Sequence, residues 1–220
     1  MMGIMDSNRY MTSHLLEDQT EPGSGRRVLR NLLGIKSQRE MDQVEARELK
    51  RTEDVLFRTY DQSHRFTASD ISRMHKLWLG KVYGWAGQYR HVKLSKGNFS
   101  FAFPAQIPQL MRSLEKGPLQ RYTPCRVRSR EGVVKALAEV HAEMVLIHPF
   151  REGNGRIART LATLMALQAR LPPLDFSPIQ GKKRDYYFAA VRAGLEQNYR
   201  PMEQVFRWVL QKSLSGRSLI

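Results

Sequence analysis

The chain has 220 residues, of which 41% are hydrophobic and 26% are charged, and these values are ordinary for a soluble globular protein with one sizeable domain. No stretch is apolar for long enough to span a bilayer, the N-terminus lacks the pattern of a Sec-type signal peptide, and the single cysteine excludes an internal disulfide. The 36 Lys and Arg residues against 21 Asp and Glu residues give a net charge of +15, which favours an anionic partner such as nucleic acid, a nucleotide, an acidic protein or a membrane surface.

Helical periodicity dominates the chain after a polar, turn-rich N-terminal segment. The spacing of apolar residues predicts helices over residues 38–60, 67–84, 107–116, 131–147, 155–171, 184–197 and 201–212. The second of these begins with a capping pattern, in which Thr67 precedes Asp70 by three residues, and Gly84 is expected to mark its end. The fourth should stop at His148, because a residue before proline is disfavoured in the helical conformation. The predicted fold class is therefore all-α.

One segment of the chain departs from the helical period. In residues 88–104, phenylalanines alternate with small residues after a run of β-branched and aromatic residues, and the turn-forming group Ser95 to Asn98 lies between the two runs. This pattern predicts a β-hairpin inserted into an otherwise helical protein.

A glycine-rich loop joins the predicted helices 131–147 and 155–171. Gly153, Asn154 and Gly155 stand where the second helix begins, and free backbone N–H groups and the positive end of the helix dipole favour an anion there. Arg156 and Arg159 are spaced i, i+3 and should project from one helical face. Two guanidinium groups beside such a turn suit a polyphosphate better than a single carboxylate.

The same loop carries an acid and a base. A carboxylate at Glu152 would repel a phosphate unless a cation lay between them, so we expect Mg²⁺ there. His148 can accept a proton from an attacking hydroxyl near neutral pH. We expect Phe150 to be buried and Arg151 to face solvent. Each of these residues alone is typical of a turn, a helix end or a solvated face, but together they predict phosphoryl or nucleotidyl transfer.

Residues 148–159, HPFREGNGRIAR, match at every position the signature of the Fic family, His-Pro-Phe-x-(Asp/Glu)-Gly-Asn-Gly-Arg-x-x-Arg. Residues 85–111 resemble the β-hairpin flap of that family, and residues 31–48 resemble the entry helix of its bacterial members. The resemblance implies the Fic fold, a helical bundle with a central helix–loop–helix and an inserted β-hairpin flap. It divides the chain into an N-terminal extension (1–30), a Fic domain (31–212) and a C-terminal tail (213–220).

The resemblance implies protein adenylylation, in which AMP moves from ATP to a target hydroxyl and pyrophosphate leaves. His148 would then deprotonate a Ser, Thr or Tyr hydroxyl, and Glu152 would hold Mg²⁺ between the α- and β-phosphates. Arg156 would bind the β- and γ-phosphates and Arg159 the γ-phosphate. The phosphate oxygens would be cradled by Gly153, Asn154 and Gly155.

The flap has two implied roles. Lys96, Gly97 and Asn98 would hold the backbone of the target protein by strand addition, and Lys96 and Gly97 would also lie beside the nucleotide. Tyr186 and Tyr187 match loosely the positions that contact adenine in the family, and an equally good interpretation places them in the core of a helix.

The resemblance also bears on the transferred group. Death-on-curing kinases replace the second glycine of the loop, reverse the nucleotide and transfer phosphate, whereas this chain keeps Gly155 and Arg156. AMP transfer is therefore favoured, and transfer of UMP or phosphocholine stays open.

Fic activity is often restrained by a helix carrying Ser/Thr-x-x-x-Glu-Gly/Asn, whose glutamate pairs with the arginine that matches Arg159. Only residues 13–18 approach this pattern: Ser13 and Glu17 have the spacing, but Asp18 replaces Gly or Asn. We therefore expect a separate, small acidic antitoxin to supply the glutamate, which also suits the charge of +15.

The leading hypothesis is thus an adenylyltransferase that acts as a toxin or effector, in the bacterial cytoplasm or after secretion into another cell without a Sec signal. The alternatives are a basic nucleic-acid-binding module, whose loop would grip backbone phosphates, and a catalytically silent Fic scaffold.

Overall fold

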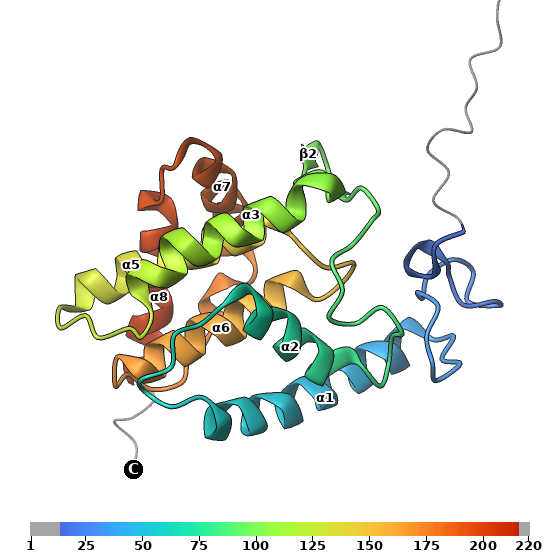
Figure 1. The fold of residues 1–220 in the computed structure, drawn as a ribbon, viewed down its shortest axis with the longest axis horizontal. Helices are drawn as coiled ribbons and strands as arrows, with labels where there is room; N and C mark the ends of the chain where they lie inside the picture. The colour runs from blue at the N-terminus through green and yellow to red at the C-terminus, as the bar shows by residue number, and fades with distance from the viewer. Residues whose placement is uncertain (1–13, 216–220) are drawn as a thin grey trace, which may run out of the picture.

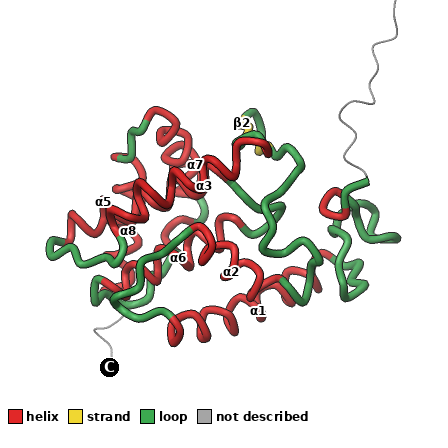
Figure 2. Tube along the Cα trace, in the orientation of Figure 1, coloured by secondary structure: helices red, strands yellow, loops and turns green. Residues whose placement is uncertain are grey.

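The structure is a computed structural model and describes residues 14–215. Figures 1 and 2 show a mainly helical molecule with one small hairpin. The α-helices are α1 (Gln38–Thr59), α2 (Ala68–Leu79), α3 (Ile107–Leu114), α4 (Gln120–Tyr122), α5 (Arg130–Ile147), α6 (Asn154–Gln168), α7 (Lys182–Ala193) and α8 (Arg200–Ser215). The strands are β1 (Ser95–Lys96) and β2 (Phe99–Ser100), and short 3₁₀ turns are η2 (Leu16–Asp18), η3 (Pro104–Gln106), η5 (Ser177–Ile179) and η6 (Gly194–Glu196). The predicted all-α class with an inserted hairpin is confirmed.

Helix α5 is the centre of the fold. Thirteen of its 18 residues are buried, as is expected of a helix that is apolar on nearly all sides. It packs against α6, α8, α3 and α7, and α2 joins α1 to α6. Figure 1 shows α1 and α2 on one side of the bundle, with the hairpin projecting from the opposite side. The loop that joins α5 to α6 therefore follows directly from the central helix of the fold.

Helices α1 and α2 follow the sequence closely at their starts. Ser37 caps α1, and Thr67 and Asp70 form the predicted capping box of α2. The predicted end of α2 at Gly84 is wrong, because the helix ends at Leu79. The N–H groups of Val82 and Tyr83 both donate to the Leu79 carbonyl oxygen, which closes the last turn. Both side chains are buried, so the apolar pattern continues although the helix does not.

The hairpin is shorter than predicted. Ser95 pairs with Ser100 and Lys96 with Phe99, so the strands begin inside the group that was expected to form the turn. Gly97 has a φ of +57°, which glycine adopts freely, and it turns the chain together with Asn98. One further backbone bond runs from Phe101 N–H to the Leu94 carbonyl oxygen. The residues on either side are extended but have no strand ladder.

The remaining helix ends differ from the predictions by a few residues, with one larger departure. Helix α3 does not stop near residue 116 but continues through a π-helical turn, η4 (Glu115–Leu119), into α4. Pro118 lies inside this turn; a proline has no N–H to donate, and a wider turn avoids its clash with the preceding carbonyl.

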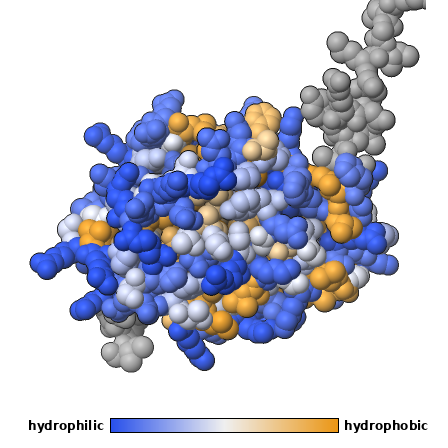
Figure 3. Space-filling model, in the orientation of Figure 1, coloured by the Kyte–Doolittle hydropathy of each residue, from blue (hydrophilic) through white to orange (hydrophobic). Residues whose placement is uncertain are grey.

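The surface is polar. Figure 3 shows a mainly hydrophilic face with scattered apolar patches, in keeping with the high net charge. Within the described residues, no helix has both the length and the apolar character needed to cross a bilayer.

Candidate active site

A cavity of about 1430 Å³ opens between the hairpin, the loop after α5, the start of α6, and α7 with the segment that precedes it. It is lined by nearly all the predicted site residues, namely Lys96, Gly97, His148, Glu152, Gly153, Asn154, Gly155, Arg156 and Arg159. Asn98 is the exception, because it lies at the exposed tip of the hairpin and does not line the cavity. The structure thus brings together residues from two segments about 50 positions apart in the sequence.

His148 is held in one orientation and one protonation state. It caps α5 in the left-handed conformation, with φ 51° and ψ 57°, which costs a non-glycine residue ~1–2 kcal/mol. Its Nδ1–H donates to the Val145 carbonyl oxygen at 3.1 Å, so Nε2 carries the free lone pair. Burial lowers the pKa of His148 to about 4, and the nearby charges of Arg90 and Lys96 act in the same direction. The imidazole is therefore neutral at pH 7, as a general base requires.

The hairpin covers His148 directly. The ring of Phe101 stacks on the imidazole, with centroids 3.7 Å apart and an interplanar angle of 16°. Farther along, the Lys96 ammonium lies 3.8 Å from the centroid of Phe188 on α7, so the tip of the hairpin reaches across the cavity. Burial lowers the pKa of Lys96, as does its neighbour Arg184.

The two glycines of the loop serve different purposes. Gly153 has a φ of +80°, and a Cβ there would lie 2.5 Å from the indole of Trp78, so packing against the protein requires glycine. Gly155 has ordinary helical geometry, and a Cβ there would meet no protein atom within 4 Å. The space above Gly155 therefore belongs to the cavity, where a phosphate can approach the backbone N–H groups of the first turn of α6.

The side chain of Asn154 closes the loop. Its side chain is 2% exposed and does not point at a ligand. Oδ1 accepts from the Phe150 N–H at 2.8 Å, and Nδ2 donates to the Phe150 carbonyl oxygen at 2.7 Å. The side chain closes the loop, and only the backbone of Asn154 is left for an anion.

Arg156 is shared between two carboxylates. Its guanidinium lies 2.7 Å from Glu45 on α1 and 3.2 Å from Glu152, and it stacks 4.6 Å over the ring of Trp78. Glu45 is buried and also accepts a hydrogen bond from the Tyr83 hydroxyl at 2.7 Å. The position of Arg156 is therefore set by the protein before any phosphate binds.

Arg159 differs from Arg156 in having no acidic partner. Among residues 14–215, no carboxylate oxygen lies within 4 Å of its guanidinium. Burial lowers its pKa, partly offset by Tyr187 and Glu53. A half-buried guanidinium that no carboxylate of the described residues contacts directly, although the charge of Glu53 acts on it from farther away, is a site for an anion.

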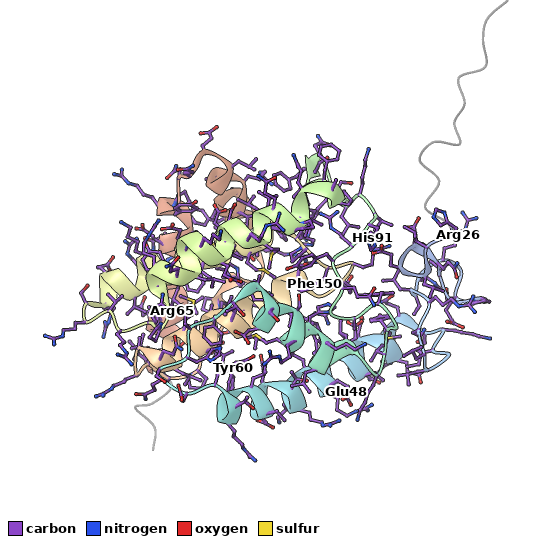
Figure 4. The ribbon with its side chains drawn as sticks, viewed as in Figure 1. Arg26, Glu48, Tyr60, Arg65, His91 and Phe150 are labelled. Atoms are coloured by element: carbon purple, nitrogen blue, oxygen red, sulfur yellow. The ribbon has the colours of Figure 1, made fainter. Side chains whose placement is uncertain are left out.

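Two residues that the sequence analysis missed hold the loop in place. His75 on α2 accepts from the Gly87 N–H at Nδ1 and donates from Nε2 to the Glu152 carbonyl oxygen, at 2.8 and 3.0 Å. Its ring stacks on Phe150 at 4.0 Å, and Phe150 is fully buried as predicted, in the interior of the bundle (Figure 4). Arg90 bonds the carbonyl oxygens at the end of α5.

Arg151 and Glu17, two residues considered in the sequence, contact each other. Arg151 does not face solvent freely, because it is half-buried and its Nε–H donates to the Glu17 carbonyl oxygen at 2.8 Å. The carboxylate of Glu17 accepts from the N–H of His91 at 2.7 Å, where the N-terminal segment meets the bundle (Figure 4). It does not pair with Arg159, and Ser13 lies outside the described residues.

The two tyrosines of α7 are placed differently from each other. Tyr187 is buried, lines the cavity and shares a 2.9 Å hydrogen bond with His141. Tyr186 packs against Trp208 and is not in the lining of the cavity.

Metal binding by protein side chains alone is not supported. In the part of the chain that the structure describes, no three His, Cys, Asp or Glu side chains are grouped so as to hold an ion. Glu152 offers one carboxylate at the cavity, with Oε1 accepting from the Gly153 N–H at 2.8 Å. A single carboxylate fits Mg²⁺ only when substrate phosphates complete its coordination.

Comparison with known proteins agrees with this geometry. A model of the Fic/DOC family matches residues 65–166. "Probable protein adenylyltransferase y4lH" of Sinorhizobium fredii is 33% identical over 72% of this chain and 80% of its own length. "Protein adenylyltransferase VbhT" of Bartonella schoenbuchensis is 34% identical over 68% of this chain, but the match spans only 30% of VbhT.

A solved structure shares the fold. The N-terminal Fic domain of a VirB-translocated Bep effector protein from Bartonella quintana, solved with bound ADP, superposes with a TM-score of 0.68 and 25% identity. The match covers 92% of this chain and 100% of that one. The loop signature, the helical bundle with its hairpin and these relatives lead to one conclusion: the chain belongs to the Fic/DOC family.

Proposed function

We propose that this protein is an adenylyltransferase that moves AMP from ATP to a hydroxyl side chain of a target protein. The observation that carries the proposal is a neutral, oriented His148 facing the same cavity as a glycine-lined helix N-terminus and an arginine without a counter-ion. The curated relatives y4lH and VbhT are named for this activity.

The proton transfer follows from the tautomer of His148. With Nδ1–H donated to Val145, Nε2 accepts the proton of the target hydroxyl as its oxygen attacks the α-phosphorus of ATP. The new bond is oxygen to α-phosphorus, the bond to the bridging oxygen of the β-phosphate breaks, and pyrophosphate leaves. The proton on Nε2 is afterwards released to solvent, which restores the base.

The cavity lining combines cationic and aromatic groups. Gly155, Arg156 and Arg159 lie at the start of α6 and suit a triphosphate. Phe176, Tyr187 and Phe188 also line the cavity, and aromatic rings suit a purine base. The combination supports a nucleotide over an inorganic polyphosphate.

Glu152 is the residue that would hold Mg²⁺ together with the substrate phosphates. The ion would neutralise charge that builds up on the leaving pyrophosphate. In the protein alone, the Glu152 carboxylate already lies 3.2 Å from Arg156, so the acid and the arginine are arranged side by side for the same phosphate group.

The hairpin is the site proposed for the target backbone. In the described part of the chain, its sheet has only two strands, so the outer edge of each is free to pair with an added strand. Lys96 and Gly97 line the cavity at this edge, and Asn98 extends it outward.

The test uses ATP labelled at either the α- or the γ-phosphate, incubated with Mg²⁺, the protein and a cell lysate. AMP transfer predicts protein-bound label from the α-position only, reduced about 10²–10⁴-fold in His148→Ala. Protein-bound label from the γ-position would instead indicate a kinase. Competition with UTP and CDP-choline separates AMP transfer from the transfer of another phosphate-containing group.

Absence of labelling by the wild type and by His148→Ala alike would contradict the proposal and leave a nucleic-acid-binding module or a silent scaffold. A nucleic-acid module has no use for a neutral base in the lining of a cavity, so the geometry favours the enzyme. Fluorescence anisotropy with DNA and RNA, at two salt concentrations, tests that alternative independently.

We also propose that a separate acidic protein restrains the enzyme, as an antitoxin does a toxin. The net charge of +15 and the lack of an acidic partner for Arg159 among the described residues support this. Expression of the protein alone should slow growth of its host more than expression of His148→Ala. Equal growth of the two strains would contradict a toxin role for the protein.

The likeness to VirB-translocated effectors supports action in a second cell as an alternative to the bacterial cytoplasm. A reporter fusion assayed for transfer between cells distinguishes the two locations.

A further inference from the structure

Arg90 is a buried arginine that forms no salt bridge within residues 14–215; the charge of Glu17 acts on it only from a longer distance. Its side chain is among the largest fully buried ones, with 1% exposed, and no carboxylate of residues 14–215 lies within 4 Å of it. Every hydrogen bond of its guanidinium goes to a backbone carbonyl oxygen. A charged group buried in this way is costly unless its hydrogen bonds are needed, which raises the question of what they hold.

One set of these bonds ends at the catalytic histidine. Nε–H donates to the His148 carbonyl oxygen at 2.7 Å, and Nη2–H donates to the Ile147 carbonyl oxygen at 3.5 Å. The backbone N–H of Arg90 donates to the Pro149 carbonyl oxygen at 2.8 Å. The last carbonyl groups of a helix lack partners within it and favour a positive charge. Arg90 therefore fixes the left-handed turn in which His148 stands.

The other set ends at the two sides of the hairpin. Nη1–H donates to the Val92 carbonyl oxygen and Nη2–H to the Ala102 carbonyl oxygen, each at 2.6 Å. The strand ladder covers only residues 95–100. At the base of the hairpin, the Arg90 guanidinium joins its two sides where backbone hydrogen bonds between strands are absent. Ala102 follows Phe101, whose ring stacks on the His148 imidazole.

We propose that Arg90 is a positioning residue that ties the hairpin to His148, so that the surface that holds the target and the base that deprotonates it keep one fixed spacing. The inference rests on the proposed adenylyl transfer for its functional meaning, but the coupling itself is a property of the free protein. A single side chain sets the turn behind His148, the base of the hairpin and, through Ala102, the aromatic ring over the imidazole.

The test compares Arg90→Lys and Arg90→Gln with a control, Gln168→Met. Gln168 is a buried side chain that also bonds backbone groups, the Cys125 N–H and the His64 carbonyl oxygen, but at the far end of α6 from the loop. Its loss controls for general destabilisation. Lysine keeps the charge of Arg90 but cannot bond all four carbonyl groups. Arg90→Lys therefore tests the hydrogen bonds of the guanidinium separately from its charge.

The first measurement is made on the free protein and needs no activity. The ring nitrogens of His148, assigned by their absence in His148→Ala, are followed by NMR against pH. The wild type and Gln168→Met should show the Nδ1–H tautomer. Both Arg90 variants should show a mixture of tautomers, and in Arg90→Gln the pKa of His148 should rise because the positive charge facing it from Arg90 is lost and only that of Lys96 remains.

The second measurement is the adenylylation rate, taken at a temperature where all variants are folded. A shift of about 1 Å in a reacting group costs up to about 100-fold, so we expect Arg90→Lys to lower kcat by about 10- to 100-fold and raise KM for the target protein, with ADP affinity unchanged. Wild-type kcat, KM and His148 tautomer in folded Arg90→Lys would overturn the proposal. If the Arg90 variants show the expected mixture of His148 tautomers but the wild type has no adenylylation activity, only the proposed function is refuted.

Discussion

Replacement of Asn154 by alanine should separate loop closure from phosphate binding. In the structure its amide joins the N–H and the carbonyl oxygen of Phe150 at 2.8 and 2.7 Å, with 2% of the side chain exposed. Asn154→Ala leaves both backbone groups buried without a partner, at a cost of about 1–3 kcal/mol each. We therefore expect the free energy of unfolding to fall by about 4 kcal/mol, a large share of the total stability of a domain.

The loss should extend to nucleotide binding although the Asn154 amide bonds the backbone of Phe150. A loop that is no longer closed exposes the backbone N–H groups of α6 in many orientations, so affinity for ADP should fall by at least about tenfold, or ~1.4 kcal/mol. Urea denaturation measures the first quantity and isothermal titration calorimetry the second.

Asn31→Ala is the matched control for this prediction. The Asn31 amide also clips a loop, donating to the carbonyl oxygens of Leu29 and Ile35 at 3.1 and 2.9 Å, but it is partly exposed and lies in the N-terminal segment. Its loss should cost less, because water can replace the bonds, and ADP affinity should not change. Stability and ADP affinity of Asn154→Ala equal to those of Asn31→Ala would refute the reasoning.

Three further predictions follow from the site. Gly153→Ala should lower the melting temperature strongly, because its Cβ would clash with the Trp78 indole at a φ of +80°. Gly155→Ala should keep the melting temperature of the wild type but weaken ADP binding, because its methyl group would occupy the cavity. A lower melting temperature in Gly155→Ala than in Gly153→Ala would contradict these roles. Glu45→Gln should lower the free energy of unfolding by about 3 kcal/mol, since it leaves a partly buried guanidinium without one of its anions. Glu48→Gln on the same helix, where the arginine partners are exposed, should change it by less than about 1 kcal/mol. Equal effects in urea denaturation would argue against a buried pair. Acid should destabilise the protein as the pH falls from about 6.5 towards 4. Burial lowers the pKa values of His75, His141 and His148 in the folded protein, so protons bind these histidines in the unfolded chain first. A melting temperature that is constant over this pH range would contradict the neutrality of the buried histidines.

The sequence predicted what depends on local pattern. The capping box at Thr67, the end of α5 at His148 and the burial of Phe150 follow from turn chemistry and periodicity, and the structure has each of them. The site loop was predicted as a unit because its residues are contiguous in the chain.

The sequence did not predict what depends on long-range contacts. The strands are short, and beyond them the Arg90 side chain bonds both sides of the hairpin. Glu45 is 111 residues before Arg156 in the numbering, yet the two form an ion pair. The side chain of Asn154 bonds the buried backbone groups of Phe150, a role that its place in the signature does not indicate. Each of these pairings joins a side chain to a group that only the folded chain brings near.

The central claim is that His148 deprotonates a hydroxyl that then receives AMP. The direct measurement is tandem mass spectrometry of lysate proteins incubated with ATP, Mg²⁺ and the wild type or His148→Ala. The account predicts a mass increase of one adenylyl group on Ser, Thr or Tyr side chains with the wild type, and its absence with the variant. Modified peptides in equal amounts with both proteins, or a phosphate in place of the adenylyl group, would contradict it.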